Sequence, residues 1–391
     1  MSRILYISLF FLFVAATCKQ EEISPQADIL SPELGIEAVP AHLGKAYVRN
    51  FDRYTKVLTP DGGAIHIVAQ NRISNEQIIR CRSILEHFLR DYPGSKYGSN
   101  KAAIANQMAK NEATLVLLNG RDDGSNKVRV KGQSLFEEEI QVEGNSWYVD
   151  QSYENHRDAA YEEILHLVHD YGIGVDGPNS SPGAAADFQT EIRAAQVEAL
   201  SKEIWGKGAP DWIEELSKEN SLSQEYLASL IDSYYGLWGA WTGSEDRGMW
   251  GIYAAKRRED IGKVDPLGEA LMDKKFFHPY LTYNARIDAT FSGTFSMKYD
   301  PNVPYSHHAR YLKDIHLLGE NPIDVRVNEW DNDITGNAGT NTVIFSGKYE
   351  EYEISSEGED TRVKDLQSER DGNNLLRKVE KLQFQNKSIS L

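Results

Sequence analysis

The segment YEEILHLVHDYGI, residues 161–173, decides how the fold and function of this chain are interpreted. Its apolar residues recur at helical spacing, so we predict a helix over residues 157–171. Within nine positions this helix carries two imidazoles and three carboxylates: Glu162, Glu163, His166, His169 and Asp170. Two interpretations are open. The polar residues hold a metal ion, or they form the solvated face of an amphipathic helix.

The spacing of these residues allows a shared ligand face. Glu162 and His166 lie four residues apart, so their side chains project from the same side of a helix, one turn apart. Carboxylate and imidazole groups both bind zinc. His169 can share the face of His166, and Asp170 can either ligate or orient an imidazole. A metal-free i,i+4 pair between Glu162 and His166 would also support the helix.

The segment EEILH, residues 162–166, resembles the zinc-protease signature His-Glu-x-x-His. The resemblance implies that His166 is a zinc ligand and that Glu163 is the general base acting on a metal-bound water. Glu162 occupies the position of the first histidine. A carboxylate there makes the site richer in oxygen and weakens the activation of water.

The order of elements is also similar to that of the zincin superfamily. In its Glu-zincin branch a glutamate from the next helix supplies the third ligand, which implies Glu191, with Glu198 as the second choice. Gly172 stands where the longer metzincin motif has its third histidine. We therefore expect an α+β fold: a zincin-like α/β and helical core over residues 45–284, followed by an all-β module over 285–391.

Local patterns predict the elements around this helix. Strands are expected where apolar residues are continuous, and helices where they follow a helical period after a capping residue or proline. The expected strands are 63–71, 113–120 and a pair within 134–153 that turns at Gly144-Asn145; the expected helices begin at Ser74 or Asn75, near Asn100, at 188 and at Pro210.

The N-terminal segment reads as an export signal. Arg3 precedes a largely apolar run over residues 4–16 that is short for a membrane span. Small residues then lead to Cys18, which resembles a bacterial lipoprotein signal and implies a lipid anchor on Cys18; ordinary cleavage and secretion is the alternative. Residues 19–44 are polar and proline-bearing, as in a tether. Cys81 is expected to be a buried, inert thiol.

The charge balance excludes some partners. The chain has 42 basic and 59 acidic residues and a formal net charge of −17. Nucleic acids and anionic membrane surfaces need a cationic footprint, so neither is expected as a partner. An acidic soluble protein that binds cations is compatible with these numbers. The sequence does not indicate an oligomeric state.

The C-terminal region contains a nonapeptide pattern. Residues 336–344, GNAGTNTVI, resemble the hemolysin-type, or RTX, calcium-binding repeat Gly-Gly-x-Gly-x-Asp-x-apolar-x. Asn332 and Asn341 stand in the positions of the metal-binding aspartate. Because calcium affinity depends on the charge of the ligands, we expect weak calcium binding at these two positions or none, and a β-roll that serves as a folded cap.

These observations predict an exported, lipid-anchored or secreted zinc peptidase of the cell envelope that acts on a peptide or protein. The predicted site comprises Glu162, His166, His169 and Glu191 as candidate ligands and Glu163 as the base. The alternative is a non-catalytic envelope or adhesion protein on a peptidase-like scaffold, with or without metal. The adjacent His307 and His308 are expected to be a surface pair on a strand.

Overall fold

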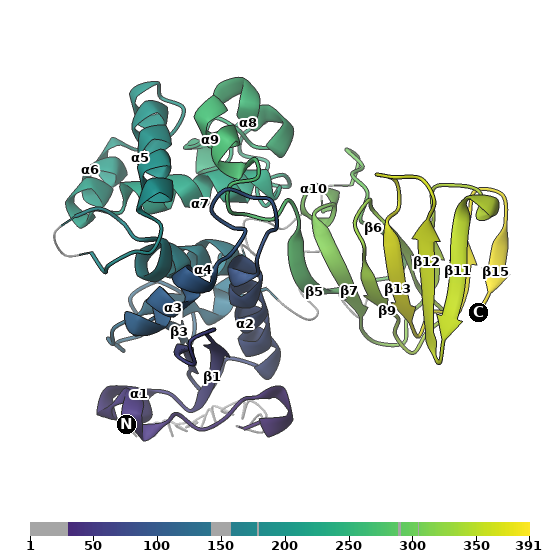
Figure 1. Cartoon of the computed structure of the whole chain (residues 1–391), viewed down its shortest axis with the longest axis horizontal. Helices are drawn as coiled ribbons and strands as arrows, with labels where there is room; N and C mark the ends of the chain where they lie inside the picture. The colour runs from purple at the N-terminus through teal and green to yellow at the C-terminus, as the bar shows by residue number, and fades with distance from the viewer. Residues whose placement is uncertain (1–29, 142–157, 178–179, 288–290, 304) are drawn as a thin grey trace, which may run out of the picture.

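The computed structural model describes residues 30–141, 158–177, 180–287, 291–303 and 305–391. An α/β lobe is followed by a module of two β-sheets, so the α+β class is confirmed (Figure 1). The signal segment, Cys18 and the predicted turn at Gly144-Asn145 lie outside the described residues. No described helix has both the length and the apolar character needed to span a membrane.

A four-stranded sheet forms the base of the α/β lobe. The strand order is β1-β2-β3-β4, with β1 and β2 antiparallel and the other neighbours parallel. The strands are β1 Arg53–Leu58, β2 Ala64–Ala69, β3 Thr114–Leu118 and β4 Gln133–Phe136. All five residues of β3 are buried, which explains its uninterrupted apolar run. The strands expected near 63–71 and 113–120 are confirmed.

Two helices pack on this sheet as predicted. They are α2, Asn75–Leu89, and α3, Ala102–Lys110. Ser74 caps α2 in a capping box: its side chain accepts from the Gln77 backbone N–H, and the Gln77 side chain accepts from the Ser74 backbone N–H. Cys81 is buried on α2, and burial raises the pKa of its thiol, in agreement with an inert role.

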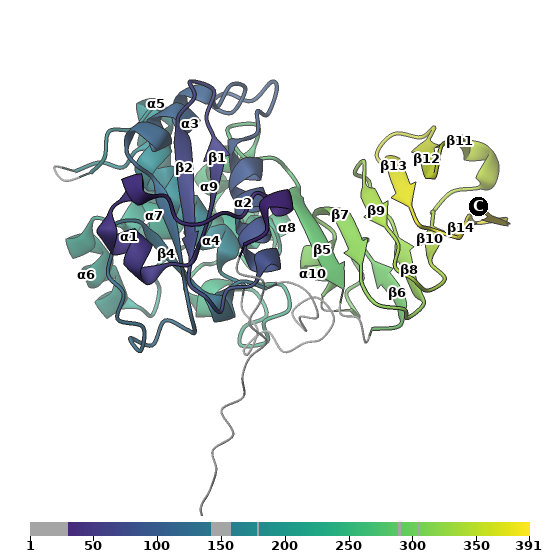
Figure 2. The ribbon, with the colours of Figure 1, turned by 90° about the horizontal axis from the view of Figure 1, so that it is seen from below.

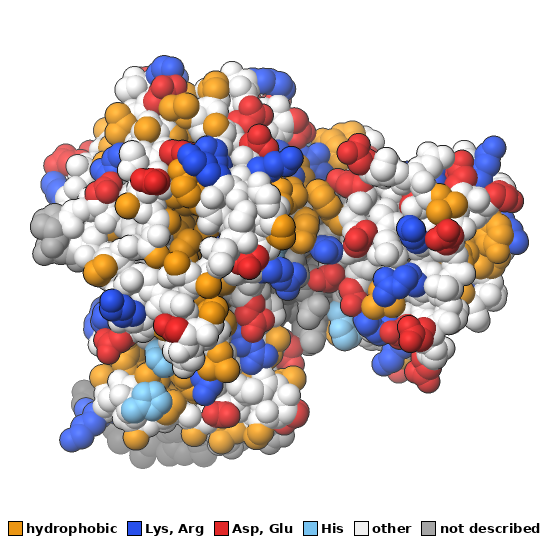
Figure 3. Space-filling view, viewed as in Figure 1, with side chains coloured by type: hydrophobic (Ala, Val, Ile, Leu, Met, Phe, Trp, Pro, Cys, Tyr) orange, Lys and Arg blue, Asp and Glu red, His pale blue; other side chains and the backbone are white. Residues whose placement is uncertain are grey.

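A group of helices completes the lobe (Figure 2). They are α1 Lys45–Asn50, α4 Ala160–Val168, α5 Ala186–Ser201, α6 Pro210–Glu219, α7 Leu222–Tyr234, α8 Arg258–Val264 and α9 Pro266–Met272. Helix α4 is central, because it packs against α2, β4 and α7. On the face in Figure 3, acidic and basic side chains are interspersed, so no single-sign surface covers this side.

The C-terminal module is a two-sheet solenoid. Its successive strands alternate between two parallel sheets, β5, β7, β9 and β13 in one and β6, β8, β10 and β14 in the other. These strands are β5 Leu281–Ile287, β6 Gly293–Ser296, β7 Leu312–Leu317, β8 Ile323–Arg326, β9 Asp333–Thr335, β10 Thr342–Ile344, β13 Asn373–Arg377 and β14 Lys381–Gln383. Strand β5 begins slightly before the expected boundary at 285.

Antiparallel strands end both sheets at the far side of the solenoid. They are the hairpin β11 Tyr352–Glu357 and β12 Asp360–Asp365, and the strand β15 Ser388–Ser390. At the other side, β5 contacts α2 of the α/β lobe. The His87 ring also lies 3.0 Å from the Tyr280 carbonyl oxygen through Nε2. The solenoid is therefore covered at each end (Figure 1).

Buried asparagines join successive coils. The Asn332 amide donates to the Lys313 carbonyl at 2.8 Å, and the Asn341 amide donates to the Ile323 carbonyl at 3.1 Å. Asn328 and Asn337 make equivalent bonds to earlier carbonyls. Asn332 and Asn341 stand where the calcium-binding repeat that this segment resembles has aspartate. Their side-chain amides instead donate hydrogen bonds to backbone carbonyls of an earlier coil.

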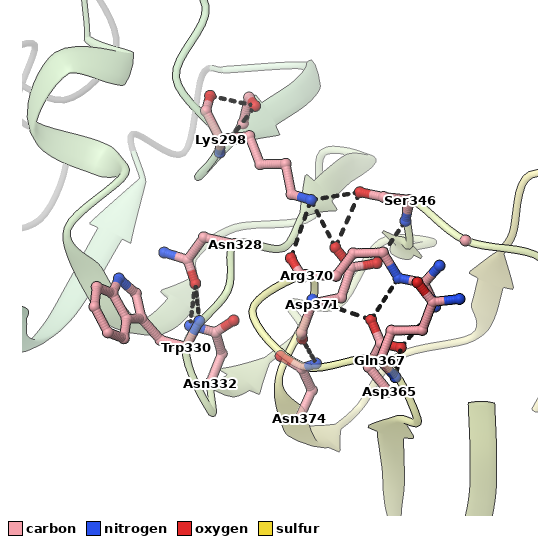
Figure 4. A network of polar contacts seen from close by, with 12 residues as sticks. Lys298, Asn328, Trp330, Asn332, Ser346, Asp365, Gln367, Arg370, Asp371 and Asn374 are labelled. Atoms are coloured by element: carbon pink, nitrogen blue, oxygen red, sulfur yellow. Dashed lines mark hydrogen bonds and ion pairs between the residues drawn. The ribbon is translucent and has the colours of Figure 1, made fainter. Parts of the chain in front are cut away.

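A polar network fixes the junction between the hairpin and the solenoid (Figure 4). Asp371 is buried and accepts from Lys298 Nζ at 2.7 Å, Ser346 N at 2.6 Å and Tyr352 OH at 2.6 Å. Arg370 meanwhile forms two hydrogen bonds to the Asp365 carboxylate. Each buried charge in this network has a partner of opposite charge, which offsets the cost of removing it from water.

Two predictions about local structure are wrong. The helix expected over 157–171 is α-helical only from Ala160 to Val168, within the described residues, and then widens into a π-helical turn, His169–Ile173. His307 and His308 lie on a short helix, α10 Ser306–Ala309, and both are buried. On a strand, the two histidines would point to opposite faces and form a pair at the surface. Tertiary packing of this helical segment instead buries both rings.

Candidate metal centre

Helix α4 is positioned by a buried ion pair at its start. Arg80 of α2 contacts Asp158, and both side chains are almost fully buried. The other Asp158 oxygen accepts a hydrogen bond from the Ala160 backbone N–H at 3.0 Å. The Arg80 guanidinium also lies 5.3 Å from the centre of the Tyr161 ring. Helix α2 thus fixes both the position and the first turn of the helix that carries the candidate ligands.

The π-helical turn fixes the end of α4. The Gly174 N–H donates to the His169 carbonyl at 2.8 Å, which is the i,i+5 bond of a π-helix. A Cβ added at Gly172 would lie 2.7 Å from side-chain atoms of Ile104 and Met108, so only glycine allows α3 to approach this closely. The wider turn changes the direction of the side chains that follow His169.

Three side chains converge at the middle of α4. Glu162 and His166 come from α4, and Glu225 comes from α7. Their potential ligand atoms all lie within 4.8 Å of one another. His166 Nε2 is 3.8 Å from Glu225 Oε1. Among the described residues this buried nitrogen has no hydrogen-bond partner. It faces the Glu225 carboxylate at a distance too long for a hydrogen bond.

Electrostatics favour a cation at this position. Burial lowers the pKa of His166, but the carboxylates of Glu225, Glu163 and Asp170 outweigh it and raise the pKa to about 9. Asp170 lies largely within the protein, where burial raises the pKa of its carboxyl against the opposing effects of His166 and Gln224. In the metal-free protein a proton on His166 supplies positive charge that the carboxylates attract.

The chemical composition of the group is compatible with a divalent metal ion. In a tetrahedral zinc site neighbouring ligand atoms lie about 3.4 Å apart, given metal–ligand bonds of about 2.1 Å. The distance between His166 Nε2 and Glu225 Oε1 is within a few tenths of an ångström of that value. Two carboxylates and a neutral imidazole also balance the charge of a dication. The buried nitrogen without a partner is then accounted for.

Glu163 lies beside this group. Its Oε2 accepts a hydrogen bond from Gln133 Nε2 of β4 at 2.6 Å and is 3.7 Å from His166 Nδ1. The Glu163 side chain is 23% exposed. The Glu163 carboxylate therefore retains contact with solvent, and its hydrogen bond to Gln133 fixes its orientation. Both properties suit a general base that takes a proton from water.

His169 points away from the group. Its Nε2 donates to Gln189 Oε1 of α5 at 2.6 Å, and Gln189 in turn donates to Ser223 Oγ at 3.2 Å. Burial lowers the pKa of His169 to about 4, so the ring is neutral and can donate through only one nitrogen. The structure places this candidate ligand in a contact between helices.

Glu191 and Glu198 also lie elsewhere. Glu191 accepts from Lys96 at 2.6 Å, Lys275 at 2.7 Å and Tyr97 at 2.8 Å. Although burial raises the pKa of Glu191, these partners lower it to about 2. Glu198 of α5 pairs with Lys202, the residue that directly follows that helix. The carboxylate that joins Glu162 and His166 is therefore Glu225 and comes from a later helix than expected.

Glu225 was missed from the sequence, although it leaves a signal there. In the α7 segment LSQEYLASLIDSY most positions are buried, and Glu225 and Asp232 are its only charged residues. A charge within a buried helix is unusual unless it is paired or binds a metal. Spacing alone cannot select Glu225, because which carboxylate faces α4 depends on how α5 and α7 pack.

Comparison with known proteins adds no relative. No protein-family model matches the chain, and no curated protein matches it significantly. The functional argument below therefore depends on the geometry of the group formed by Glu162, His166 and Glu225 and on the surrounding residues.

Proposed function

We propose that the chain is a zinc-dependent hydrolase of peptide bonds, with Glu162, His166 and Glu225 as the metal ligands. One observation carries the proposal: two carboxylates and an imidazole, supplied by helices α4 and α7, lie with their potential ligand atoms within 4.8 Å of one another, which is the kind of cluster that a divalent cation can bridge. The similarity of EEILH to a zinc-protease signature agrees with the same two α4 residues.

In this proposal each nearby residue has a defined role. Zinc supplies a Lewis acid that polarises the scissile carbonyl and lowers the pKa of water. Glu163 accepts the proton of the attacking water and later returns it to the leaving amine. Gln133 holds the Glu163 carboxylate through its 2.6 Å hydrogen bond. The partly buried Asp170 lies close enough to His166 to favour the charged form of the imidazole.

A peptide substrate fits the surroundings of the group. Within the described sheet β4 pairs only with β3, so it is an edge strand, and it also contacts α4. An edge strand can bind an extended peptide through backbone hydrogen bonds. Gln133 lies on β4 and contacts Glu163, so a peptide along this edge would pass beside the proposed base.

The first test measures zinc content and peptide hydrolysis in the full chain and in matched variants. Wild type should bind about one zinc per chain. Glu225→Gln should lose most of it, whereas Glu191→Gln should retain it, because Glu191 is held by two lysines. The two variants therefore distinguish Glu225, the third ligand that the geometry indicates, from Glu191, the third ligand that the zincin resemblance implies.

The base is tested by Glu163→Gln, which should keep zinc and lose at least about 100-fold in hydrolysis rate. Zinc retained in Glu225→Gln but lost in Glu191→Gln would contradict the assignment of Glu225. Stoichiometric zinc without hydrolysis of any peptide in a degenerate library would reject the enzyme in favour of a metal-binding scaffold. Hydrolysis that survives Glu163→Gln would reject the assigned base.

A further inference from the structure

A second cavity lies away from the candidate metal centre. It has a volume of about 770 Å³, within the range of small-molecule sites. Its walls come from the loop between α7 and α8, from α8 itself and from α10. The lining residues that matter here are Trp241, Lys256, Arg257, Lys263, Val264 and His307. None of the proposed zinc ligands contributes to it.

Arg257 is the first sign of a ligand. Its guanidinium forms no hydrogen bond or ion pair with any residue that the structure describes, and its Nε is buried. Its neighbours are all engaged: Arg258 lies over the Tyr234 ring at 3.7 Å, and Arg310 pairs with Glu259 at 2.8 Å. The buried Nε without a hydrogen-bond partner distinguishes Arg257 from an arginine that is simply solvated at the surface.

His307 is the second sign. The residue is 6% exposed and lines the cavity, and its Nδ1 has no hydrogen-bond partner among the described residues. The backbone is packed closely behind it, since a Cβ at Gly239 would lie 2.2 Å from His307 Cβ. Burial, followed by Arg257 and Arg310, lowers the pKa of His307 to about 4. The ring is therefore neutral and can donate one hydrogen bond.

Lys256 shapes the cavity and does not neutralise a carboxylate of the chain. Its buried ammonium donates to the backbone carbonyls of Ser244, at 2.7 Å, and Trp241. These bonds hold the loop that carries Trp241 against the segment that leads into α8. Positive charge consequently remains near Arg257 without a formal counter-charge in contact.

We propose that this cavity binds the carboxylate of a small ligand that has an apolar body. The fork of the Arg257 guanidinium matches a carboxylate through two parallel hydrogen bonds, and His307 can donate a third. Trp241 and Val264 offer the apolar wall against which the body of the ligand packs.

The acidic residues around the cavity select a monoanion. Glu245 and Asp246 are part of its lining, and Asp260 is paired with Lys263 at 2.7 Å. A dianion such as phosphate would meet stronger repulsion from the Glu245 and Asp246 carboxylates than a single carboxylate, whose charge Arg257 balances. This site and the proposed hydrolase are independent, because they share no residue.

The test uses benzoate as the charged probe and benzamide as its neutral counterpart. Binding to the full chain is measured by calorimetry, together with the thermal unfolding temperature. Benzoate should bind saturably, and Arg257→Gln should weaken it at least about tenfold, the loss expected when a charged hydrogen-bonding partner is removed. Arg121→Gln is the matched control, since Arg121 is an exposed arginine paired with Glu138 on a different surface.

The outcomes separate the alternatives. Because Arg257 has no partner, Arg257→Gln should leave the unfolding temperature unchanged while benzoate binding is lost; a lower unfolding temperature with intact binding would show a structural role and overturn the proposal. His307→Gln should weaken benzoate binding to a smaller extent. Equal affinity for benzamide, tighter binding of inorganic phosphate, or no saturable binding of benzoate would each overturn the carboxylate assignment.

Discussion

At the residue scale, His166 is the group at which a proton and a metal ion compete. Its Nε2 is the nitrogen that lies beside Glu225, and it is also the nitrogen without a hydrogen-bond partner among the described residues. A zinc ligand must be a neutral imidazole, whereas the carboxylates favour the imidazolium. Zinc binding should therefore release a proton from this histidine near neutral pH.

The titration of His166 in metal-free protein is the first prediction. Its pKa should be about 9, against an ordinary value of 6.5, because the surrounding carboxylates outweigh burial. Its charged form therefore stabilises the fold fully below about pH 6.5, and this stabilisation is lost as the pH rises through about 9. Histidine proton resonances followed by NMR should show this, and Glu225→Gln should lower the value. A pKa near 6.5 in wild type would contradict the cluster geometry.

Lys101 gives a second prediction, with the opposite sign. Its buried ammonium donates to the Phe88 carbonyl at 2.8 Å and lies 4.1 Å from the centre of the Phe276 ring. Burial lowers its pKa to about 7, so between about pH 7 and 10.5 the unfolded chain binds this proton more strongly than the folded one.

The free energy of unfolding should therefore rise with pH over that window, by about 1 kcal/mol per pH unit from Lys101 alone. Urea unfolding of wild type and of Lys101→Met at pH 7, 8 and 9 isolates the contribution. Lys101→Met should be the more stable form at pH 7, and its advantage should shrink by pH 9. A constant difference between the two proteins would show that Lys101 stays charged in the fold.

At the scale of elements, apolar periodicity predicted several helices and strands, whereas the π-helical turn depends on tertiary packing. The helices over 75–89 and 186–201 and the strands near 64–69 and 114–118 follow from apolar spacing and capping residues. The π-helical turn after Val168 could not be predicted in this way. It depends on contacts with α3, which lies far away in the sequence.

The same difference between local spacing and tertiary packing explains which residues of the candidate site could be predicted. Glu162, Glu163 and His166 could be predicted because they share one helix, on which spacing fixes direction. Glu225 could not, because its place beside His166 results from the packing of α7 on α4. His169 was assigned to the same face as His166. Its backbone N–H still bonds within the α-helix, but its ring lies against α5, where Nε2 donates to Gln189.

The π-helical turn provides the third prediction. Gly172→Ala should destabilise the protein by about 1–3 kcal/mol, because the added methyl group would overlap Ile104 and Met108. Urea unfolding measures the loss. Gly120→Ala is a useful comparison: a Cβ there meets no atom within 4 Å, so any cost comes from its positive φ alone. Zinc affinity should also fall in Gly172→Ala if the turn holds α4 in place, and unchanged stability would contradict the close packing.

At the scale of the whole molecule, buried asparagine side chains link successive coils of the solenoid. Hydrogen bonds from Asn332 and Asn341 to earlier carbonyls link the coils, and the Lys298–Asp371 contact supplies positive charge at the hairpin junction. Calcium sites of extracellular modules instead rely on carboxylate ligands. We therefore expect the link between coils not to depend on a metal ion.

Calcium independence is the fourth prediction. The thermal unfolding temperature of the full chain should be the same in a chelator and in about 5 mM calcium, a concentration that saturates weak extracellular sites. Asn341→Ala should lower that temperature, because removing the amide leaves the buried Ile323 carbonyl without this donor. A rise of several degrees with calcium and not with magnesium would instead show that the asparagines ligate the ion.

The covered ends of the solenoid make its length adjustable. Helix α2 lies against β5 at one end, while the β11–β12 hairpin and β15 close the other. Inner coils meet only copies of themselves, so one more coil could be inserted without rebuilding either terminus. Each insertion would move the tip about 4.8 Å farther from the α/β lobe. Adding or removing a coil would thus change how far this arm extends while both of its ends stay covered.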